Sequence, residues 1–264
     1  MTRARILPFG IAADAGLRSP APADEHDTAA FVPDSVDLDP QRLFENGIFG
    51  FAPLDARSRS FVLLRSQLLH RFHRSGGRIL AVTSTQPGNG KTYVTTNVAA
   101  AMSRIHPTIL IDLDLRRPAI ADRLGLTPKA GIDDYLAGDA RWDETRTRVS
   151  AGNLAVHAAR LPRPDSARLL ASPDLGVMLN RIRTDPTDPI CIVDTPPVLV
   201  LDDIMLIARN VDGILMIIEE GSTRGTDLVN ALRLLSPTPI VGSVLNKSLT
   251  HGSAGYAKGY YDAP

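Results

Sequence analysis

One short segment constrains the fold of this chain most: an apolar run, a glycine-rich turn and the start of a helix. Residues 79–83 have the composition of a short buried strand, and the sequence Ser84-Thr85-Gln86-Pro87-Gly88-Asn89-Gly90-Lys91-Thr92 follows them. Beyond this turn, apolar residues recur at helical spacing. Glycines let such a turn curl so that successive backbone N–H groups and the helix N-terminus face phosphate oxygens. The segment therefore predicts a phosphate-binding P-loop.

The polar residues of this loop have expected roles. Lys91 would reach the β- and γ-phosphates of a nucleotide, and Thr92 would ligate Mg²⁺. The first glycine of the usual G-x-x-x-x-G-K-[ST] pattern is replaced by Thr85, so the pattern alone is weaker than usual. The residues expected to contact ATP at the loop are Gly88, Asn89, Gly90, Lys91, Thr92 and Tyr93.

The same alternation of apolar runs and helical patterns recurs along the chain. Further strands are expected at 108–112, 190–194, 213–218 and 239–245. Helical stretches separate them around 119–124, 175–183, 203–208 and 226–235. This rhythm predicts an α/β fold of the P-loop NTPase type, in which helices flank both faces of a mostly parallel β-sheet. Ligands of such sheets bind beyond the carboxyl ends of the strands.

Two of the expected strands end in aspartate at that edge. Asp112 and Asp114 close one strand, and Asp194 closes another. Phosphoryl transfer depends mainly on positioning and charge neutralisation, so these carboxylates are candidates to meet a metal ion held at the P-loop. We expect Mg²⁺ to be held by Thr92, Asp112 and Asp194. The expected catalytic residues are Lys91, Asp112, Asp114 and Arg116. The two aspartates would contact the metal or accept a hydroxyl proton, and Arg116 or Arg117 would counter charge on the transferring phosphoryl group.

The segments outside the core differ in composition. We expect a disordered leader over 1–39, a helical segment over 40–75, the P-loop domain over 76–247 and a flexible tail over 248–264. The tail holds Tyr256, Tyr260 and Tyr261, which are three of the five tyrosines. His70 and His73, on an arginine-rich helical pattern, are interpreted as part of a solvated face rather than as metal ligands.

Composition excludes several classes of function. Lys and Arg balance Asp and Glu at 29 each, and no long basic block suggests binding to nucleic acid. Cys191 is the only cysteine, so the chain has neither an internal disulfide nor a cysteine pair for an iron–sulfur cluster. Its apolar runs are shorter than the roughly 20 residues that a transmembrane helix needs. We expect a cytoplasmic protein that reaches the membrane only through a partner.

Three motifs together carry a resemblance to a known family. The Pro-Gly-x-Gly-Lys-Thr loop, the Asp-x-Asp-x-Arg strand end and the Asp-Thr-Pro-Pro strand end resemble those of the bacterial tyrosine kinases of capsule and exopolysaccharide synthesis. Supporting matches lie at 131–136, 169–172, 211–213 and 245–247. Residues 36–39, followed by a helix, look like the tyrosine autokinases linked to exosortase-type loci. By this resemblance Asp194 is the Walker B aspartate, Asp112 and Asp114 form the second aspartate motif, and Asn246 lies near the adenine.

The resemblance implies an ATP- and Mg²⁺-dependent, non-specific protein-tyrosine kinase. In that family a neighbouring subunit phosphorylates a tyrosine-rich tail, so Tyr256, Tyr260 and Tyr261 are the expected phosphoacceptors. The activity would regulate capsule or exopolysaccharide synthesis and export. Implied partners are a membrane chain-length-determinant adaptor that activates the kinase at the inner face of the membrane, further copies of the chain, and a cognate tyrosine phosphatase.

Two departures from the family leave the assembly open. The Glu-x-x-Arg-x-x-Arg helix motif that joins subunits into a ring reads Arg59, Val62 and Arg65 here. In the segment usually written Asn-Pro-x-Glu-Leu-Leu, the acidic position is Arg168. The geometry of the homo-oligomer is therefore not predicted.

Two other functions compete with the kinase. A cell-division or partitioning ATPase of the ParA/MinD kind would switch between monomer and dimer without phosphorylating protein. That class carries a second lysine five residues before the P-loop lysine, where this chain has Gln86. A regulatory nucleotide-binding module without kinase activity would not need the complete set of Lys91, Thr92 and strand-end aspartates that this chain retains.

Overall fold

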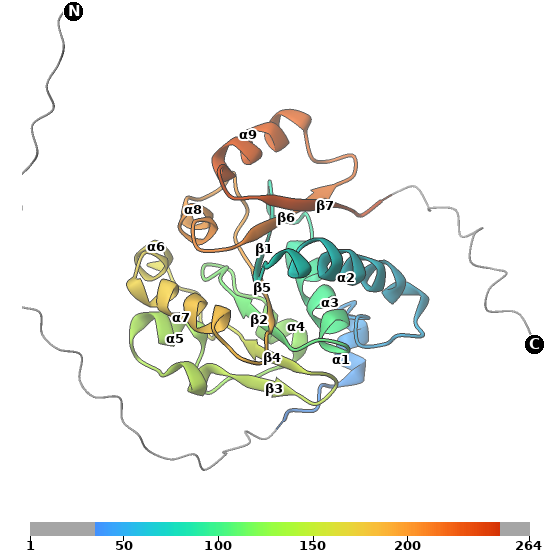
Figure 1. The fold of residues 1–264 in the computed structure, drawn as a ribbon, viewed down its shortest axis with the longest axis vertical. Coiled ribbons are helices and arrows are strands. Elements are labelled where there is room, and N and C mark those ends of the chain that lie inside the picture. Colours follow the sequence, from blue (N-terminus) through green and yellow to red (C-terminus); the bar gives the residue numbers. More distant parts are fainter. Residues whose placement is uncertain (1–34, 249–264) are drawn as a thin grey trace, which may run out of the picture. The chain divides into compact units, whose positions relative to one another are not determined.

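The computed structural model describes residues 35–248, and the three tail tyrosines lie outside that range. A seven-stranded sheet with the order β3-β4-β2-β5-β1-β6-β7 forms the centre of this part (Figure 1). All neighbouring strands are parallel except β3 and β4, which are antiparallel. The predicted α/β fold with a mostly parallel sheet is confirmed. The strands are β1 (Ile79–Ser84), β2 (Thr108–Asp112), β3 (Thr147–Val149), β4 (Leu154–His157), β5 (Ile190–Asp194), β6 (Gly213–Glu219) and β7 (Ile240–Asn246).

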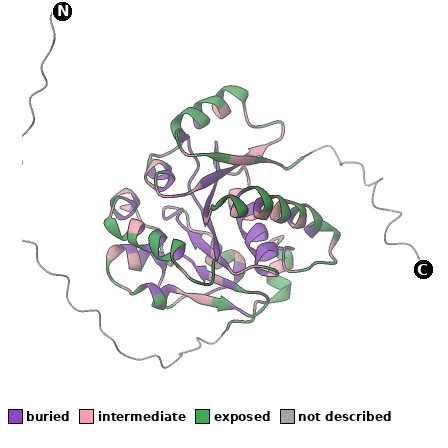
Figure 2. Ribbon diagram, in the orientation of Figure 1, coloured by how far each residue is buried: buried purple, intermediate pink, exposed green. Residues whose placement is uncertain are grey.

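Helices cover both faces of the sheet, so the central strands are buried on both sides (Figure 2). One face packs against α2 (Arg59–Arg71), α3 (Lys91–Ser103) and α4 (Ile120–Leu124), and α1 (Pro40–Glu45) lies beside α4. The other face packs against α5 (Ile132–Ala137), α6 (Ser166–Leu170), α7 (Pro173–Arg183), α8 (Asp203–Ala208) and α9 (Gly225–Leu235). Every residue of β1 and β5 is buried, which explains why these strands are apolar almost throughout rather than alternating.

The antiparallel edge of the sheet was not predicted from the sequence. Its strands β3 and β4 have three and four residues, too few to give a clear period. Val36 forms a bridge with Val149 of β3, and its amide donates to the carbonyl of Arg148 at 2.8 Å. The leader predicted over 1–39 therefore extends a few residues too far, because Val36 already pairs with the sheet.

The interpretation of His73 as a solvated residue was wrong. Helix α2 ends at Arg71, and His73 begins a 3-10 turn, η2 (His73–Ser75), that leads back to the sheet. Gly76, with φ +91°, completes the reversal, a conformation that glycine adopts without strain. The turn carries the His73 side chain inward, where 12% of it is exposed, while His70 on α2 remains exposed as expected.

Candidate functional site

The glycine-rich turn between β1 and α3 adopts the backbone expected of a phosphate cradle. Gly88 has φ +83° and Gly90 has φ +90°, a left-handed region that strains other residues. A Cβ at Gly90 would lie 2.1 Å from Nδ2 of Asn246. Because α3 begins at Lys91, its first backbone N–H groups have no partner within the helix and face outward as donors. Both conformation and space therefore require glycine at position 90.

Thr85 shows why the first glycine of the usual pattern can be absent. The described non-glycine residues with positive φ are Asp188 and Lys247, so Thr85 does not need a glycine conformation. Its side chain is fully buried, and its hydroxyl donates to Oδ1 of Asn89 at 3.3 Å. The amide of Gln86 donates to the same oxygen at 3.0 Å. The side chain of Asn89 therefore joins the two ends of the loop through hydrogen bonds inside it.

Lys91 is held against the aspartates that follow β2. Its Nζ lies 2.6 Å from Oδ2 of Asp114, and 13% of the lysine side chain and 6% of the aspartate side chain are exposed. Burial alone would lower the pKa of Lys91, but the nearby carboxylates of Asp194, Asp114 and Asp112 outweigh burial and raise it. The carboxylates around Lys91 therefore favour its charged ammonium form.

Asp194 is bonded to two hydroxyls of α3. Oδ2 accepts from Thr92 at 2.6 Å, and Oδ1 accepts from Thr95 at 3.0 Å. Burial raises the pKa of the fully buried Asp194 carboxyl, although Lys91 and the two hydroxyls act in the opposite direction. Thr95 was not predicted as a site residue. The sequence could have indicated it, because Thr95 follows Lys91 by four residues and therefore lies on the same face of the helix.

Asp112 supports the local backbone in addition to lying at the site. Its Oδ2 accepts from the amides of Ala119 and Ile120 at 2.9 and 3.1 Å, at the start of α4, and its Oδ1 accepts from the amide of Asp114 at 3.2 Å. Burial and the neighbouring charge of Asp194 raise the pKa of the Asp112 carboxyl. Asp112 and Asp194 are register partners on adjacent strands, which places two carboxylates side by side.

A cavity of about 430 Å³ opens beside the P-loop. Arginines line one side: Arg117 and Arg123 face it, and so does Arg116, whose Nε lies 2.9 Å from Oδ2 of the buried Asp203. Arg116 is thus already paired, whereas no ion pair is recorded for Arg117 or Arg123 within residues 35–248. Arg123 was not predicted, since it lies on α4, away from any motif. The remaining wall comes from P-loop residues and from 196–201.

The far side of the P-loop is braced by the ends of β6 and β7. Asn246 donates from Nδ2 to the carbonyl of Asn89 at 2.9 Å, and Asn89 donates from Nδ2 to Oε2 of Glu219 at 2.8 Å. Lys247 completes the group through an ion pair of 3.0 Å with Glu219. Glu219 was missed in the sequence, although it too is a carboxylate at the end of a strand that neighbours the P-loop strand.

This geometry can be compared with known proteins. No family model matches the chain. The succinoglycan biosynthesis transport protein ExoP of Rhizobium meliloti is 29% identical over 183 residues, which cover 66% of this chain and 23% of ExoP. A putative tyrosine-protein kinase, CapB of Staphylococcus aureus, is 23% identical over 74% of this chain and 86% of its own length. The kinase domain of Escherichia coli tyrosine kinase ETK is 25% identical, with a TM-score of 0.72 over 79% of this chain and 83% of that domain.

These relatives and structural neighbours support the bacterial tyrosine kinase family for this chain. It spans about a quarter of the length of the first curated relatives, as the 23% coverage of ExoP shows. Within residues 35–248, no helix is both long enough and apolar enough to cross a bilayer.

Proposed function

We propose that this chain is an ATP- and Mg²⁺-dependent protein-tyrosine autokinase that phosphorylates Tyr256, Tyr260 and Tyr261 of a neighbouring copy. The observation that carries the proposal is a pair of contacts at the carboxyl edge of the sheet, in which Lys91 pairs with Asp114 while Thr92 bonds to Asp194. Lysine, hydroxyl and carboxylates are the groups that phosphoryl transfer needs, and they come from three separate segments of the chain. Family membership makes tyrosine the expected acceptor.

The residues would exchange partners when the nucleotide binds. Mg²⁺ would neutralise phosphate charge, and Thr92 and Asp194, now bonded to each other, are the groups that would hold it. Lys91 would turn from Asp114 to the phosphate oxygens. Asp114 would then be free to accept the tyrosine O–H proton as the tyrosine oxygen bonds to the γ-phosphorus and the bond to the ADP oxygen breaks. Arg117 and Arg123, on the cavity wall, are placed to counter the developing charge.

The pathway that the kinase regulates and the proteins that it acts with are also proposals. Regulation of capsule or exopolysaccharide synthesis and export follows from the relatives, as does activation by a membrane chain-length-determinant adaptor at the cytoplasmic face. Similarity to CapB over 86% of that protein's length supports a tyrosine kinase. The other proposed partners are further copies of the chain and a cognate tyrosine phosphatase. Within the family, the chain would belong to the branch of exosortase-linked autokinases.

The test compares purified full chains with labelled ATP and Mg²⁺, with and without the adaptor. Wild type should acquire phosphotyrosine, whereas Lys91→Ala and the triple Tyr256/Tyr260/Tyr261→Phe chain should not. Nucleotide hydrolysis by wild type without phosphotyrosine under either condition would refute the kinase and favour an ATPase switch. Absence of both activities, with ATP binding retained, would favour the regulatory module.

A further inference from the structure

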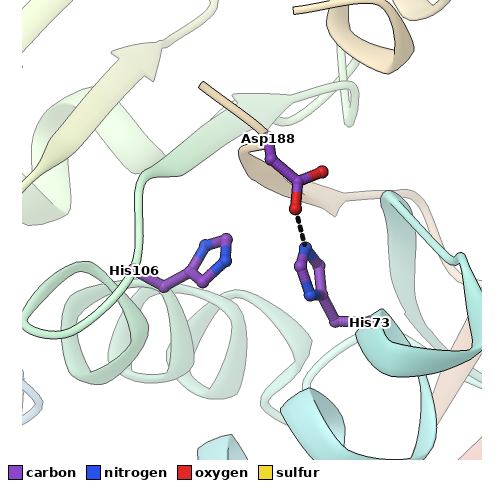
Figure 3. A group of neighbouring side chains, drawn as sticks. All are labelled: His73, His106 and Asp188. Atoms are coloured by element: carbon purple, nitrogen blue, oxygen red, sulfur yellow. Dashed lines mark ion pairs between the residues drawn. The ribbon is translucent and has the colours of Figure 1, made fainter. Parts of the chain in front are cut away.

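Three loops at the amino ends of the strands bring two histidines and an aspartate together. His73 comes just before β1, His106 just before β2 and Asp188 just before β5. One ligand atom from each of the three lies within 4.8 Å of the other two (Figure 3). The P-loop and its aspartates follow the carboxyl ends of these same strands, so the cluster lies at the opposite edge of the sheet from the candidate nucleotide site.

His106 has the proton arrangement of a metal-binding histidine. Its Nδ1 lies 3.0 Å from the carbonyl oxygen of Pro107, which can only accept, so Nδ1 carries the proton. In the neutral ring, Nε2 then holds a free lone pair. A histidine ligand is commonly fixed in this way by a bond from its other nitrogen to a backbone carbonyl. In Figure 3 a ring nitrogen of His106 faces His73, and the two ring centroids are 4.5 Å apart at an interplanar angle of 71°.

His73 supplies a buried nitrogen without a hydrogen bond. Its Nε2 is inaccessible to solvent and has no hydrogen-bond partner within residues 35–248; the nearest carboxylate oxygen is Oδ2 of Asp188 at 3.5 Å. An unsatisfied buried polar atom is costly, and a missing ion is one of the explanations for it. Burial, His106 and Arg78 lower the pKa of His73. The neutral ring is the form that binds metal.

Asp188 is oriented toward the histidines by its own backbone and by Arg78. It adopts φ +55°, a left-handed conformation that aspartate tolerates better than most residues. Nη2 of Arg78 lies 2.5 Å from its Oδ1, which leaves Oδ2 on the side of His73. Such an ion pair fixes the direction of a ligand carboxylate, while the arginine charge limits affinity for a cation.

We propose that His73, His106 and Asp188 form a binding site for a divalent transition metal of the Zn²⁺ type. Two imidazoles and one carboxylate suit Zn²⁺, and water would complete the tetrahedron because Asp188 is half exposed. Bonds near 2.0–2.1 Å place tetrahedral ligands about 3.4 Å apart, so the 3.5 Å between His73 and Asp188 already fits. The ligand atom of His106 lies within 4.8 Å of the other two, so it must approach them by at most about 1.4 Å. The ion would join the turn after α2 to the starts of β2 and β5.

The test titrates chelator-treated full chain with Zn²⁺ alone and follows binding by calorimetry and the melting temperature by circular dichroism. Wild type should bind one ion per chain and melt at a higher temperature when loaded. His106→Gln and Asp188→Asn should weaken binding at least 10-fold. Asn tolerates the left-handed conformation at position 188, so this variant keeps the turn.

Two controls separate this site from others. His70→Ala removes an exposed histidine of α2 three residues before His73, and Asp194→Asn removes a carboxylate at the opposite edge; both chains should bind Zn²⁺ as wild type does. Absence of saturable binding in folded wild type would overturn the proposal and leave the cluster as a polar contact between His73 and Asp188. Equal binding by His106→Gln and wild type would overturn it as well.

Discussion

Asp194 and Asp212 lie at opposite edges of the sheet, and their carboxylates have different partners. At the carboxyl edge, Asp194 is fully buried, and its carboxylate accepts from the hydroxyls of Thr92 and Thr95. At the amino edge, 25% of the Asp212 side chain is exposed, and it accepts from the amides of Arg78 and Ile79 at 2.9 Å each. Hydroxyls can rotate to other acceptors, whereas backbone amides are fixed. We infer that Asp212 stabilises the fold, whereas the carboxylate of Asp194 can exchange its hydroxyl partners for a ligand.

Of the substitutions that test this contrast, Lys91→Ala should lower the rate of phosphotyrosine formation most. The variant removes the ammonium that would bind phosphate and leaves Asp114 without its ion-pair partner. Phosphotyrosine formation should fall by at least about 100-fold, as expected when a charge-stabilising donor is removed. Lys129→Ala, which changes an exposed lysine, is the matched control and should keep the wild-type rate. A rate for Lys91→Ala within a few fold of wild type would contradict the assignment of the site.

Asp194→Asn should lower the transfer rate by about 100-fold without unfolding the chain. The amide cannot replace a carboxylate near Mg²⁺, but its size is conserved and the hydroxyls of Thr92 and Thr95 can reorient around it. Initial rates at saturating ATP and Mg²⁺, measured with a thermal melt, separate the two properties. Loss of folding in this variant would show that Asp194 is structural, like Asp212.

Asp212→Ala should have the opposite effect: it should lower the stability of the chain and leave the transfer rate unchanged. Two backbone amides lose their acceptor, and Arg183, 2.7 Å from Oδ1, loses its ion pair. The free energy of unfolding should fall by about 1–3 kcal/mol, the usual cost of unsatisfied donors. Well below the melting temperature, kcat should remain that of wild type. A large drop in kcat with unchanged urea unfolding would place Asp212 in the catalytic apparatus and break the comparison.

The raised pKa values at the carboxyl edge make stability depend on pH. Burial and Asp194 raise the pKa of Asp112 to about 8, above its ordinary value in the unfolded chain, so the folded state holds protons that the unfolded state has released. Stability is therefore full below about pH 4 and falls as the pH rises from about 4 to 8, with a slope on the order of 1 kcal/mol per pH unit.

Urea unfolding of the nucleotide-free chain across this range measures that slope. Asp194→Asn removes the neighbouring charge, so its stability should change less with pH than that of wild type. A wild-type stability that rises between pH 5 and 8 would show that the aspartates are stabilised as anions.

The smallest effect is expected from Thr95→Val. The substitution keeps the shape of the side chain and removes the hydroxyl that donates to Asp194 at 3.0 Å. With one of two donors lost, transfer should slow by about 3- to 10-fold, equivalent to roughly 1 kcal/mol. Thr96→Val is the matched change, because that hydroxyl donates to the carbonyl of Thr92 rather than to a carboxylate. Equal rates for the two variants would remove Thr95 from the site.

The sequence predicted the parts of this site that depend on local pattern. A glycine-rich turn after an apolar strand, and aspartates at the ends of β2 and β5, are visible because strand ends in a parallel sheet share an edge. Partners contributed by distant elements were not visible. Nothing near Asp112 indicates that its carboxylate also binds the start of α4, and nothing near Arg116 indicates its ion pair with Asp203.

The histidine cluster was missed for the same reason. His73, His106 and Asp188 are far apart in the sequence and meet only because β1, β5 and β2 are adjacent in the sheet. The helical pattern through residue 72 placed His73 on an exposed helix face, whereas α2 ends before it and the chain turns inward. Strand order is set by long-range packing, so contacts between loops at the strand starts follow only from the complete fold.

The central claim is that the site formed by Lys91, Asp114, Thr92 and Asp194 transfers a phosphoryl group to the tail of another copy. The direct measurement mixes two complementary full chains with labelled ATP and Mg²⁺, in the presence of the adaptor: Lys91→Ala with its tyrosines intact, and the Tyr256/Tyr260/Tyr261→Phe chain with its site intact. Phosphotyrosine should appear on the Lys91→Ala chain, and only in the mixture. A mixture that leaves that chain unlabelled, while wild type alone becomes phosphorylated, would contradict transfer between copies.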